Sequence, residues 1–344
     1  MDSMKLEDCC EILDSQRVPI TGSDRTSGDY PYYGANGIQD YVDDFIFDDE
    51  LVLLAEDGGN FGSKTRPIAY RVSGKCWVNN HAHVLKPKAG LDVDYLCYSL
   101  MFYDVGGMVN GATRQKLTQA AMRQMIIPKR SLDEQIEIVN IIKKVQGVIA
   151  SRKEELEQLD LLIKARFVEM FGDPIYNANN LPMMCLNDLG VWNSGGTPSR
   201  TNPAYFTGEI DWYSAGELNT LYLEGSIEKI TEEAIQESAA KLFKAGSMLV
   251  GMYDTAAFKM GILKKASASN QACACIEPNE TVNIVWLYYS LQLMKEHFLS
   301  QRRGVRQKNL NLGMIKGFEI PIADRGKQDE FVCFAEQVDK SKVV

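Results

Sequence analysis

Two short segments of the chain combine basic side chains with glutamine in a way suited to holding phosphate groups. The two triplets are Arg114, Gln115, Lys116 and Arg306, Gln307, Lys308. They lie within residues 105–130 and 298–318, which contain no Asp or Glu, and Arg302 and Arg303 precede the second triplet. Basic segments without acids attract the phosphate backbone of nucleic acid whatever its base sequence. The alternative is a solvated helix face or a structural contact with a neighbouring helix.

Metal chemistry is the second option that the residue types raise. His81 and His83 are two positions apart, so on a strand they would share one face. A metal site needs further ligands, and the remaining histidine is His297. The eight cysteines include no C-x-x-C pair, so we expect no zinc site and no bound metal. Structural or polar roles are expected for both histidines.

A glycine-rich sequence spans residues 57–66 and ends in Lys64, Thr65 and Arg66. It lacks the glycine spacing of a P-loop. One interpretation is a tight loop between strands. The other is a DNA-facing loop, because a glycine-rich backbone flanked by basic side chains can approach phosphates closely.

Group transfer to DNA is the only catalytic option with any motif behind it. Residues 173–176, Asp-Pro-Ile-Tyr, faintly resemble the D-P-P-Y motif of amino-methyltransferases. The second proline is missing, and no F-x-G-x-G cofactor loop follows a strand. A helix stop at Gly172 and Pro174 explains the same residues. We therefore expect no cofactor and no catalysis, with a fused DNA adenine methyltransferase as the enzyme alternative.

Composition bounds the class of protein. The chain has 344 residues, enough for two domains and a helix, with 45% hydrophobic and 24% charged residues. Its net charge of −9 taken alone argues against nucleic acid, but the acids cluster elsewhere, as in residues 40–57. No apolar run approaches the roughly 18 residues of a membrane span. The acidic start of the chain is unlike a signal peptide, so a cytoplasmic protein without membrane contact is expected.

The element that must position these residues is a long helix over residues 131–171. Ser131 and Glu134 form a capping box at its start, and Gly172 with Pro174 closes it. A helix of about 40 residues would be ~60 Å long. Apolar residues recur at alternating spacings of four and three, which predicts a seam for packing against another helix. The seam residues are Ile138, Ile142, Val145, Ile149, Leu156, Leu159, Ile163 and Met170.

The order of features before this helix returns after it. The matched pairs are residues 5–8 with 185–188, 50–56 with 247–250, 80–83 with 270–273, Pro87 with Pro278, 93–102 with 285–293, 111–117 with 304–310, residues 127–128 with 320–321, and Gln135 with Gln328. Short strands are expected over 50–56, 69–72, 75–78 and 82–85, and a helix over 93–102. A divergent repeat of this size predicts two copies of one domain.

If the basic triplets hold phosphates in both copies, bases must be read by residues that differ between the copies. Arg and Lys can pair with guanine and Asn with adenine. The candidates in the first domain are Tyr32, Tyr33, Asn36, Lys64 and Arg66, and those in the second domain are Thr197, Ser199, Arg200, Tyr213, Tyr253 and Lys259.

Taken together, the pattern resembles the specificity (S) subunit of type I restriction–modification enzymes. The resemblance rests on two domains that each end in a basic segment, Ile-Pro and a helix, and on residues 167–174, which are similar to the end of that family's spacer helix. It implies two target-recognition domains that each read half of a split duplex DNA site. It also implies that methylation and cleavage belong to partner methyltransferase (M) and restriction (R) subunits.

The predicted fold is therefore α/β (α+β), with two recognition domains joined by long coiled-coil spacer helices in a pseudo-two-fold arrangement. Its expected parts are a first domain over 1–130, a central spacer over 131–172, a second domain over 173–325 and the start of a distal spacer over 326–344. A coiled-coil adaptor that never touches DNA is the non-enzymatic alternative.

The second spacer helix is expected to run antiparallel to the first. Phe331, Ala335 and Val338 would cover the near end of the central seam. The segment is too short to cover the whole seam, and we expect a truncated chain whose residues 138–149 are exposed. Such a stripe invites self-association or a methyltransferase subunit.

Overall fold

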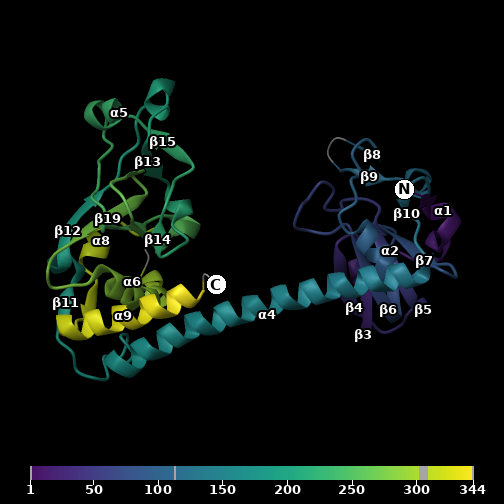
Figure 1. Ribbon diagram of the computed structural model, residues 1–344, viewed down its shortest axis with the longest axis horizontal. Helices are drawn as coiled ribbons and strands as arrows, with labels where there is room; N and C mark the ends of the chain where they lie inside the picture. Colours follow the sequence, from purple (N-terminus) through teal and green to yellow (C-terminus); the bar gives the residue numbers. More distant parts are fainter. Residues whose placement is uncertain (1, 112–113, 302–308, 343–344) are drawn as a thin grey trace. The chain divides into compact units, whose positions relative to one another are not determined.

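The computed structural model describes residues 2–111, 114–301 and 309–342 (Figure 1). The chain forms two compact units, Met1–Ser151 and Arg152–Val344. The boundary falls inside one helix, so each unit contains part of it. In the described residues, no helix is long and apolar enough to cross a membrane.

The first unit is built on a six-stranded sheet in the order β2-β7-β5-β6-β3-β4. Its strands are β1 (Ser3–Lys5), β2 (Cys10–Ile12), β3 (Ser27–Gly34), β4 (Gly37–Val42), β5 (Phe47–Ala55), β6 (Ala69–Val78), β7 (Ala82–Pro87), β8 (Val109–Asn110), β9 (Lys116–Leu117) and β10 (Ile126–Pro128). Its helices are α1 (Leu6–Cys9), α2 (Val93–Leu100), α3 (Gln119–Arg123) and the first part of α4 (Leu132–Phe171). The expected strands over 69–72 and 75–78 are one continuous strand, β6.

Strand β5 carries the core of this unit because both of its faces are covered. Leu51 and Leu53 point into one apolar cluster, with Val72 of β6. Val52 and Leu54 point into the other, which contains helix α2. This alternation explains why residues 51–55 form an unbroken apolar run, each fully buried.

Helix α4 begins and ends where the sequence predicts. Ser131 N donates to Glu134 Oε2 (2.8 Å), and Glu134 N donates back to Ser131 Oγ (3.4 Å), which confirms the capping box. The helix ends at Phe171. Gly172 follows with φ of +78°, a left-handed conformation that glycine adopts without strain.

The second unit holds a five-stranded sheet, β12-β19-β16-β17-β14, and a three-stranded sheet, β15-β13-β18. Its strands are β11 (Met183–Cys185), β12 (Gly190–Ser194), β13 (Ile210–Tyr213), β14 (Tyr222–Leu223), β15 (Glu228–Ile230), β16 (Met248–Gly251), β17 (Met260–Leu263), β18 (Ala268–Ser269), β19 (Cys273–Pro278) and β20 (Glu319–Pro321). Its helices, besides the end of α4, are α5 (Glu232–Glu237), α6 (Ile284–Leu293), α7 (Lys295–Ser300), α8 (Leu312–Lys316) and α9 (Arg325–Ser341).

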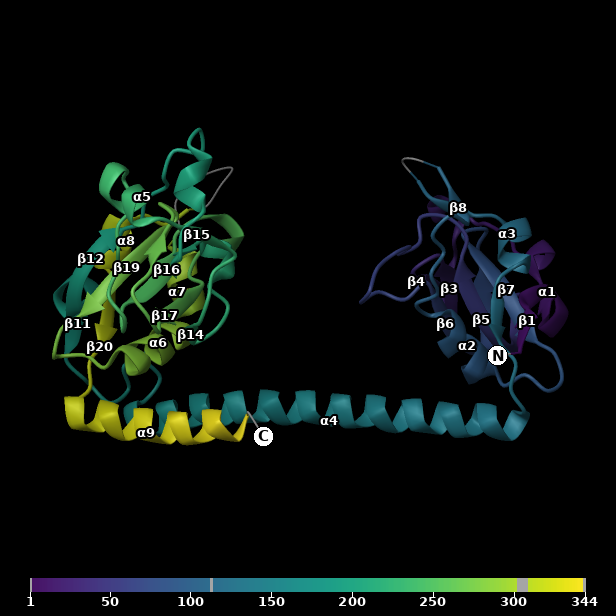
Figure 2. The ribbon, with the colours of Figure 1, turned by 45° about the horizontal axis from the view of Figure 1, so that its top comes forward.

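Within the second unit, α9 lies alongside the end of α4 and runs antiparallel to it (Figures 1 and 2). Near its start, Phe331 packs against Phe167 with ring centroids 5.2 Å apart. At its end, Arg152 Nη2 donates to the carbonyl of Lys342 (3.1 Å). Phe331, Ala335 and Val338 are buried, so the predicted pairing of the second seam helix is confirmed.

The first half of the seam behaves differently from the expectation in one respect. Val145 and Ile149 are 52% and 63% exposed, as predicted. Ile138, however, packs against the core of its own unit, beside the buried Val139, and Ile142 is half-buried. Ile141 and Val148, which are not seam positions, are exposed beside Val145 and Ile149, and these four residues are called the exposed stripe below.

The internal repeat is confirmed by matching hydrogen bonds. Gln135 is fully buried; its Oε1 accepts from Asp92 N (2.8 Å), and its Nε2 donates to two backbone carbonyls. Gln328 does the same in the second unit, where Oε1 accepts from Asn283 N (2.8 Å). Each glutamine thus ties a spacer helix to the start of the helix that follows the sheet. The pair β1–β10 likewise corresponds to β11–β20, both antiparallel.

One part of the sequence register is wrong by one residue. Asn79, not Asn80, corresponds to Asn270, because Asn79 N donates to Tyr33 O (3.0 Å) and Asn270 N to Tyr213 O (2.9 Å). His83 therefore corresponds to Ala274. Pro87 and Pro278 keep their predicted match, since each pairs with the first residue of an equivalent strand. The short sequence similarity alone did not distinguish the two registers.

Candidate nucleic-acid interface

The segment of residues 114–117 lies beside the end of β5, to which an isolated antiparallel β-bridge between Asp57 and Lys116 links it. Leu117 N donates to Glu56 O (2.7 Å), and Gly58 N donates to Gln115 O (3.1 Å). Leu117 is fully buried, whereas the three residues before it are exposed. The leucine therefore anchors the segment, and the basic side chains face solvent.

Two acids at the end of β5 pair with these bases. Arg114 Nη2 lies 2.8 Å from Asp57 Oδ1, and Lys116 Nζ lies 2.9 Å from Glu56 Oε1. The side chains of Arg114 and Lys116 are 60% and 50% exposed, so they remain open to a phosphate from the solvent side. A bound phosphate would compete with the two carboxylates for them.

Two neighbouring turns complete the surroundings of this segment. Asn36 Nδ2, from the turn between β3 and β4, donates to Gly58 O (2.9 Å), and His81 Nδ1 lies 2.6 Å from Asp57 Oδ1. Gly58 has φ of +62°, and a Cβ on it would lie 3.3 Å from Arg114 Nε. Glycine is required here for its conformation and favoured for the close approach. Strand β8, which pairs with β9, lies at the edge of the first unit away from α4 (Figure 2).

Lys64 and Arg66 project from the loop between β5 and β6 and are both exposed. Ser63 Oγ accepts hydrogen bonds from the backbone N–H groups of Thr65 and Arg66 and so shapes the loop. Across the described ranges, neither Lys64 nor Arg66 forms a side-chain ion pair. Both are therefore available for contact with nucleic acid.

The two tyrosines of β3 take different places. Tyr32 is 1% exposed, its hydroxyl bonds to the backbone of Ile20 and the guanidinium of Arg25 lies 4.2 Å from its ring centroid. It is a core residue, and the expectation that it faces a base is not met in this structure. Tyr33 is half-buried and stacks on Tyr70.

In the second unit, Arg200 is the best-defined candidate. Its Nη2 donates to Glu228 Oε2 (2.7 Å), and its guanidinium lies 4.2 Å from the ring centroid of Phe206. The hydrogen bond from Arg200 lowers the pKa of the Glu228 carboxyl. Like Arg114, Arg200 is thus an exposed arginine paired with an acid.

The remaining candidates of the second unit lie on several loops. Ser199 is exposed, Tyr253 is 39% exposed and Lys259 Nζ donates to Gly216 O (3.4 Å). Thr197 Oγ1 donates to Gln271. Tyr213 is 1% exposed, so it belongs to the core and does not face solvent.

The second basic triplet, with Arg302 and Arg303, lies outside the described residues. Its C-terminal anchor is described: Leu310 is buried and its N–H donates to Met252 O (2.8 Å), as Leu117 does to Glu56. The caps that follow also match, because Thr118 caps α3 and Asn311 caps α8 through the amide three residues later. Relative to this leucine, the second Arg-Gln-Lys triplet stands one residue earlier than the first.

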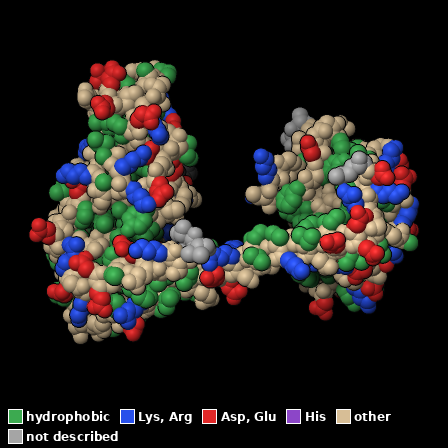
Figure 3. Space-filling model, viewed as in Figure 1, with side chains coloured by type: hydrophobic (Ala, Val, Ile, Leu, Met, Phe, Trp, Pro, Cys, Tyr) green, Lys and Arg blue, Asp and Glu red, His purple; other side chains and the backbone are tan. Residues whose placement is uncertain are grey.

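The sequence did not point to the acids Glu56, Asp57 and Glu228 as parts of these sites. The one available signal was that Glu56 and Asp57 directly follow a buried strand and open the glycine-rich loop. The visible surface of each unit shows Asp and Glu side chains among Lys and Arg side chains (Figure 3). Three of the basic candidates, Arg114, Lys116 and Arg200, are paired with acids.

Solved structures share this fold. The chain resembles the crystal structure of a type I restriction–modification S subunit from M. genitalium, with a TM-score of 0.57 and 13% identity over 99% of this chain and 90% of that one. A structure from work on complex assembly and conformational transition of the type I R-M system gives a TM-score of 0.59 at 13% identity, with the same coverage.

Curated relatives carry related names. A putative type I restriction enzyme specificity subunit of Haemophilus influenzae is 33% identical over 54% of this chain and 49% of its own length. The EcoR124I/EcoR124II specificity subunit of Escherichia coli is 23% identical over 62% of this chain and 53% of its own length. The chain thus spans about half the length of the curated relatives it matches.

The family profile described as "Type I restriction modification DNA specificity domain" matches twice, over residues 1–161 and 180–343. The two matches correspond to the two copies that the hydrogen bonds identify. This chain therefore belongs to the type I restriction–modification DNA specificity family.

Proposed function

We propose that each domain reads one half of a bipartite duplex DNA site and that the chain directs partner subunits to that site. The observation that carries this proposal is the repeated edge of the sheet. In both copies a buried leucine, Leu117 or Leu310, hydrogen-bonds to the end of the equivalent strand, and a basic triplet precedes it in the sequence. Repetition of a basic triplet just before the equivalent leucine in the sequence favours a shared task, and holding phosphates is a task that does not depend on the DNA sequence.

Base reading would fall to exposed or half-buried residues that differ between the domains. In the first domain these are Asn36, Lys64 and Arg66, together with the half-buried Tyr33. In the second they are Thr197, Ser199, Arg200, Tyr253 and Lys259. Arg200 would exchange Glu228 for a base, and a guanidinium can hold guanine O6 and N7 together. Gln115 would assist phosphate contact next to Arg114 and Lys116.

The partners of the chain are double-stranded DNA, methyltransferase subunits and a restriction subunit, and the complex works in the cytoplasm. The exposed stripe of α4, formed by Ile141, Val145, Val148 and Ile149, is suited to covering by another helix. A methyltransferase subunit or a second copy of the chain would bury it. The chain itself carries out no methylation or cleavage, because no cofactor or nuclease motif is present in its sequence.

The deciding experiment is methylation mapping. Cells lacking other methyltransferases would express this chain with its methyltransferase partner, and sequencing would locate methylated adenines. A bipartite motif with unread bases between its halves is expected, and it should disappear when either protein is left out. Methylation by the purified chain alone would refute the non-catalytic role. If the same methylated motif appeared in cells without this chain, the chain would not read DNA, and the remaining interpretation would be a coiled-coil adaptor.

A further inference from the structure

A buried cluster of charged side chains lies next to the basic segment of the first domain. His83, in β7, is fully buried; its Nδ1 lies 2.6 Å from Asp14 Oδ2 and its Nε2 lies 2.9 Å from Leu117 O. Asp14 also accepts from Val84 N (2.9 Å) and from Gln119 Nε2 (2.8 Å). Asp14 and His83 therefore connect the sheet to Leu117 and Gln119, on either side of the turn into α3.

Both ring nitrogens of His83 face oxygen atoms, Nδ1 the Asp14 carboxylate and Nε2 the carbonyl of Leu117. Burial raises the pKa of the Asp14 carboxyl, but the hydrogen bond and charge of His83, with the bonds from Gln119 and Val84, bring that pKa below its ordinary value. Breaking such a buried ion pair on one side leaves an uncompensated charge.

A metal ion is not needed to explain the cluster. Ligand atoms of Asp14, Glu56 and His83 lie within 4.8 Å of one another. Arg17 Nη1, however, lies 2.6 Å from Glu56 Oε2, and Arg17 Nη2 lies 3.5 Å from Asp14 Oδ2. The guanidinium supplies the positive charge that a metal ion would bring, and Lys116 adds a second cation on the other oxygen of Glu56.

At the equivalent positions of the second domain, all of them among the described residues, no charged side chain is present. The strand registers and hydrogen bonds that define the repeat place four other residues at the equivalent positions. Ser194 corresponds to Asp14, Met252 to Glu56, Ala274 to His83 and Leu312 to Gln119. Met252 and Ala274 are buried, and Leu312 packs against the same apolar cluster. Both leucines pack into an apolar core, but the carbonyl of Leu117 also contacts His83 Nε2, and the Ala274 side chain at the equivalent position has no polar atom for such a contact.

We propose that Asp14 and His83 are positioning residues that hold Leu117, and through it Arg114 and Lys116, at the DNA-binding edge of the first domain. This inference rests on the proposed function, because the segment matters only if it contacts DNA. Charged residues are suited to this support because the basic segment itself pairs with acids here. Lys116 pairs with Glu56, which belongs to the cluster, and Arg114 pairs with the neighbouring Asp57. The cluster therefore holds both the Glu56 carboxylate and, through His83, the carbonyl of Leu117. The second domain should not depend on any such network.

The test replaces the cluster by the second domain's own residues, Asp14→Ser, Glu56→Met, His83→Ala and Gln119→Leu. Hydrogen exchange of the full chain without DNA would be followed by mass spectrometry. Exchange in a peptide covering residues 114–122 should rise at least about tenfold, because the variant no longer makes the charged hydrogen bonds to the segment. Peptides covering β5 and residues 309–316 should not change. A role in general stability would instead raise exchange throughout β5, β6 and β7.

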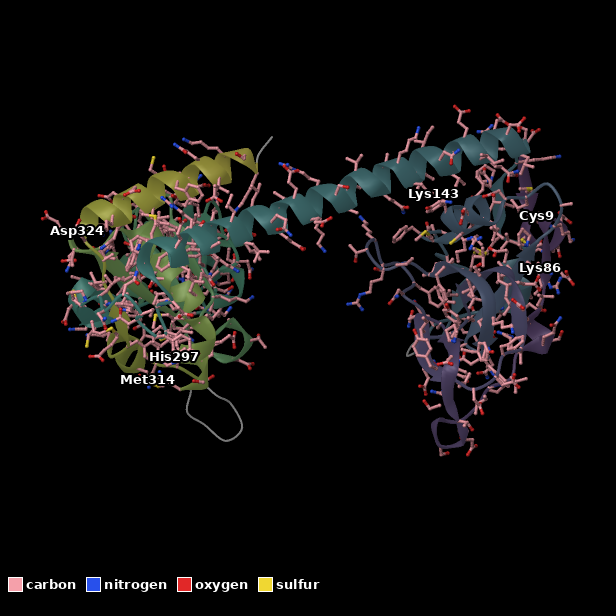
Figure 4. The ribbon with its side chains drawn as sticks, turned by 90° about the horizontal axis from the view of Figure 1, so that it is seen from below. Cys9, Lys86, Lys143, His297, Met314 and Asp324 are labelled. Atoms are coloured by element: carbon pink, nitrogen blue, oxygen red, sulfur yellow. The ribbon has the colours of Figure 1, made fainter. Side chains whose placement is uncertain are left out.

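A milder variant covers the case in which the fourfold replacement does not fold. Asp14→Asn keeps the side-chain size and the acceptor for Val84 N–H but removes the charge opposite His83. The matched control is Lys86→Ala, at the end of the same strand, β7 (Figure 4), which removes an exposed ion pair to Asp49 (2.7 Å). Exchange at 114–122 should rise in Asp14→Asn and not in Lys86→Ala.

A DNA-binding measurement distinguishes the positioning role of Asp14 and His83 from the proposed DNA-binding role of the chain. Fluorescence anisotropy with a duplex carrying the mapped site should show that Asp14→Asn weakens binding at least about tenfold relative to Lys86→Ala. If the wild-type chain in its complex bound no duplex, the DNA role itself would be overturned, while the exchange data would still report on the support of Leu117. If Asp14→Asn left both exchange at 114–122 and duplex affinity unchanged, the positioning role would be overturned and the proposed function would stand.

Discussion

At the scale of single residues, the acids that pair with the candidate arginines determine how readily those arginines can bind a phosphate. Arg114 and Arg200 are exposed, yet each donates to a carboxylate, on Asp57 and Glu228 respectively. Phosphate must displace that carboxylate before it can bind the whole guanidinium. If these arginines contact DNA as proposed, the pairing would lower affinity for DNA of any sequence, and contacts to the nucleobases would then decide which sites are bound.

Removing the basic side chains of the first domain should weaken binding to all DNA sequences alike. We expect Arg114→Ala with Lys116→Ala to raise the dissociation constant and to lower the salt slope by roughly 0.9 for each phosphate that the variant no longer neutralises. The measurement is duplex affinity at several salt concentrations, with Lys86→Ala as the control. An altered target sequence with an unchanged slope would show that these residues read bases instead.

The buried carboxylates of the first domain should make its stability depend on acid pH. Burial raises the pKa of Asp14 and Glu56, but His83 and Arg17 respectively, with other partners, bring both pKa values below 3.8 and 4.5. A carboxyl with a lowered pKa in the folded state stabilises fully above its unfolded value, and this stabilisation is lost as the pH falls through the folded value.

We therefore expect the first domain to lose stability below about pH 4. Denaturant unfolding of the wild-type chain and of Asp14→Asn with Glu56→Gln should show a difference that is largest near neutral pH and shrinks as the pH falls. A difference that stayed constant from neutral to acid pH would contradict the charged state of the two carboxylates.

At the scale of elements, the two buried glutamines are the joints between sheet domain and spacer. Gln135 and Gln328 each satisfy one N–H and two carbonyls that their surroundings would otherwise leave unpaired. Replacing either by Leu should destabilise its own unit by about 1–3 kcal/mol, because buried polar groups then lack partners. Hydrogen exchange of α2 and α6 would report this.

The two glutamine variants serve as controls for each other. Gln135→Leu should increase hydrogen exchange in α2 and not in α6, and Gln328→Leu should increase it in α6 and not in α2. Equal effects of one variant on both helices would argue against two separately stabilised units.

The exposed stripe on α4 should matter for association and not for folding. Val145→Glu with Val148→Glu changes residues that are 52% and 69% exposed, so stability should stay within about 0.5 kcal/mol of wild type. Light scattering should show weaker self-association or weaker binding of the methyltransferase partner. Ile163→Glu is the contrasting variant, because Ile163 is fully buried and its change should unfold the second unit.

Patterns that recur along the sequence predicted the helices and the repeat, whereas the types of single residues did not predict the surroundings of the candidate site residues. The capping box, the seam and the matched glutamines each repeat a physical constraint, so the sequence alone located α4, α9 and the repeat. The environment of a single side chain depends instead on distant chain segments. Tyr32 looked like a surface aromatic, but Ile20 and Arg25 cover it. For His83 the sequence predicted a structural or polar role, but it did not indicate the partners, Asp14 and Leu117.

At the scale of the whole molecule, the two copies of the domain have the same connections to the spacer helices but different residues in their interiors. Both domains share the antiparallel pair at their base, the buried glutamine and the leucine anchor. They differ in what lies between, where the first has a charged cluster and the second an apolar one with a separate three-stranded sheet. Shared joints with different interiors are the arrangement that allows one domain's target to change without the other's.

This arrangement predicts that the half-sites can be exchanged independently. Replacing residues 185–320 by the second domain of another family member should change one half of the methylated motif and leave the other half as it was. The junctions fall in the β11–β20 pair, where Cys185 pairs with Glu319 and Ile320 with Met184, so the foreign domain meets the spacer through a preserved backbone ladder. In this chain Leu186 N donates to Phe318 O (2.8 Å), and the foreign residues at these two positions should keep this bond because backbone atoms make it. Methylation mapping of the hybrid with the same methyltransferase partner is the measurement. Loss of specificity in both halves, in a hybrid whose first unit keeps its wild-type exchange pattern, would show that the two domains do not read DNA separately.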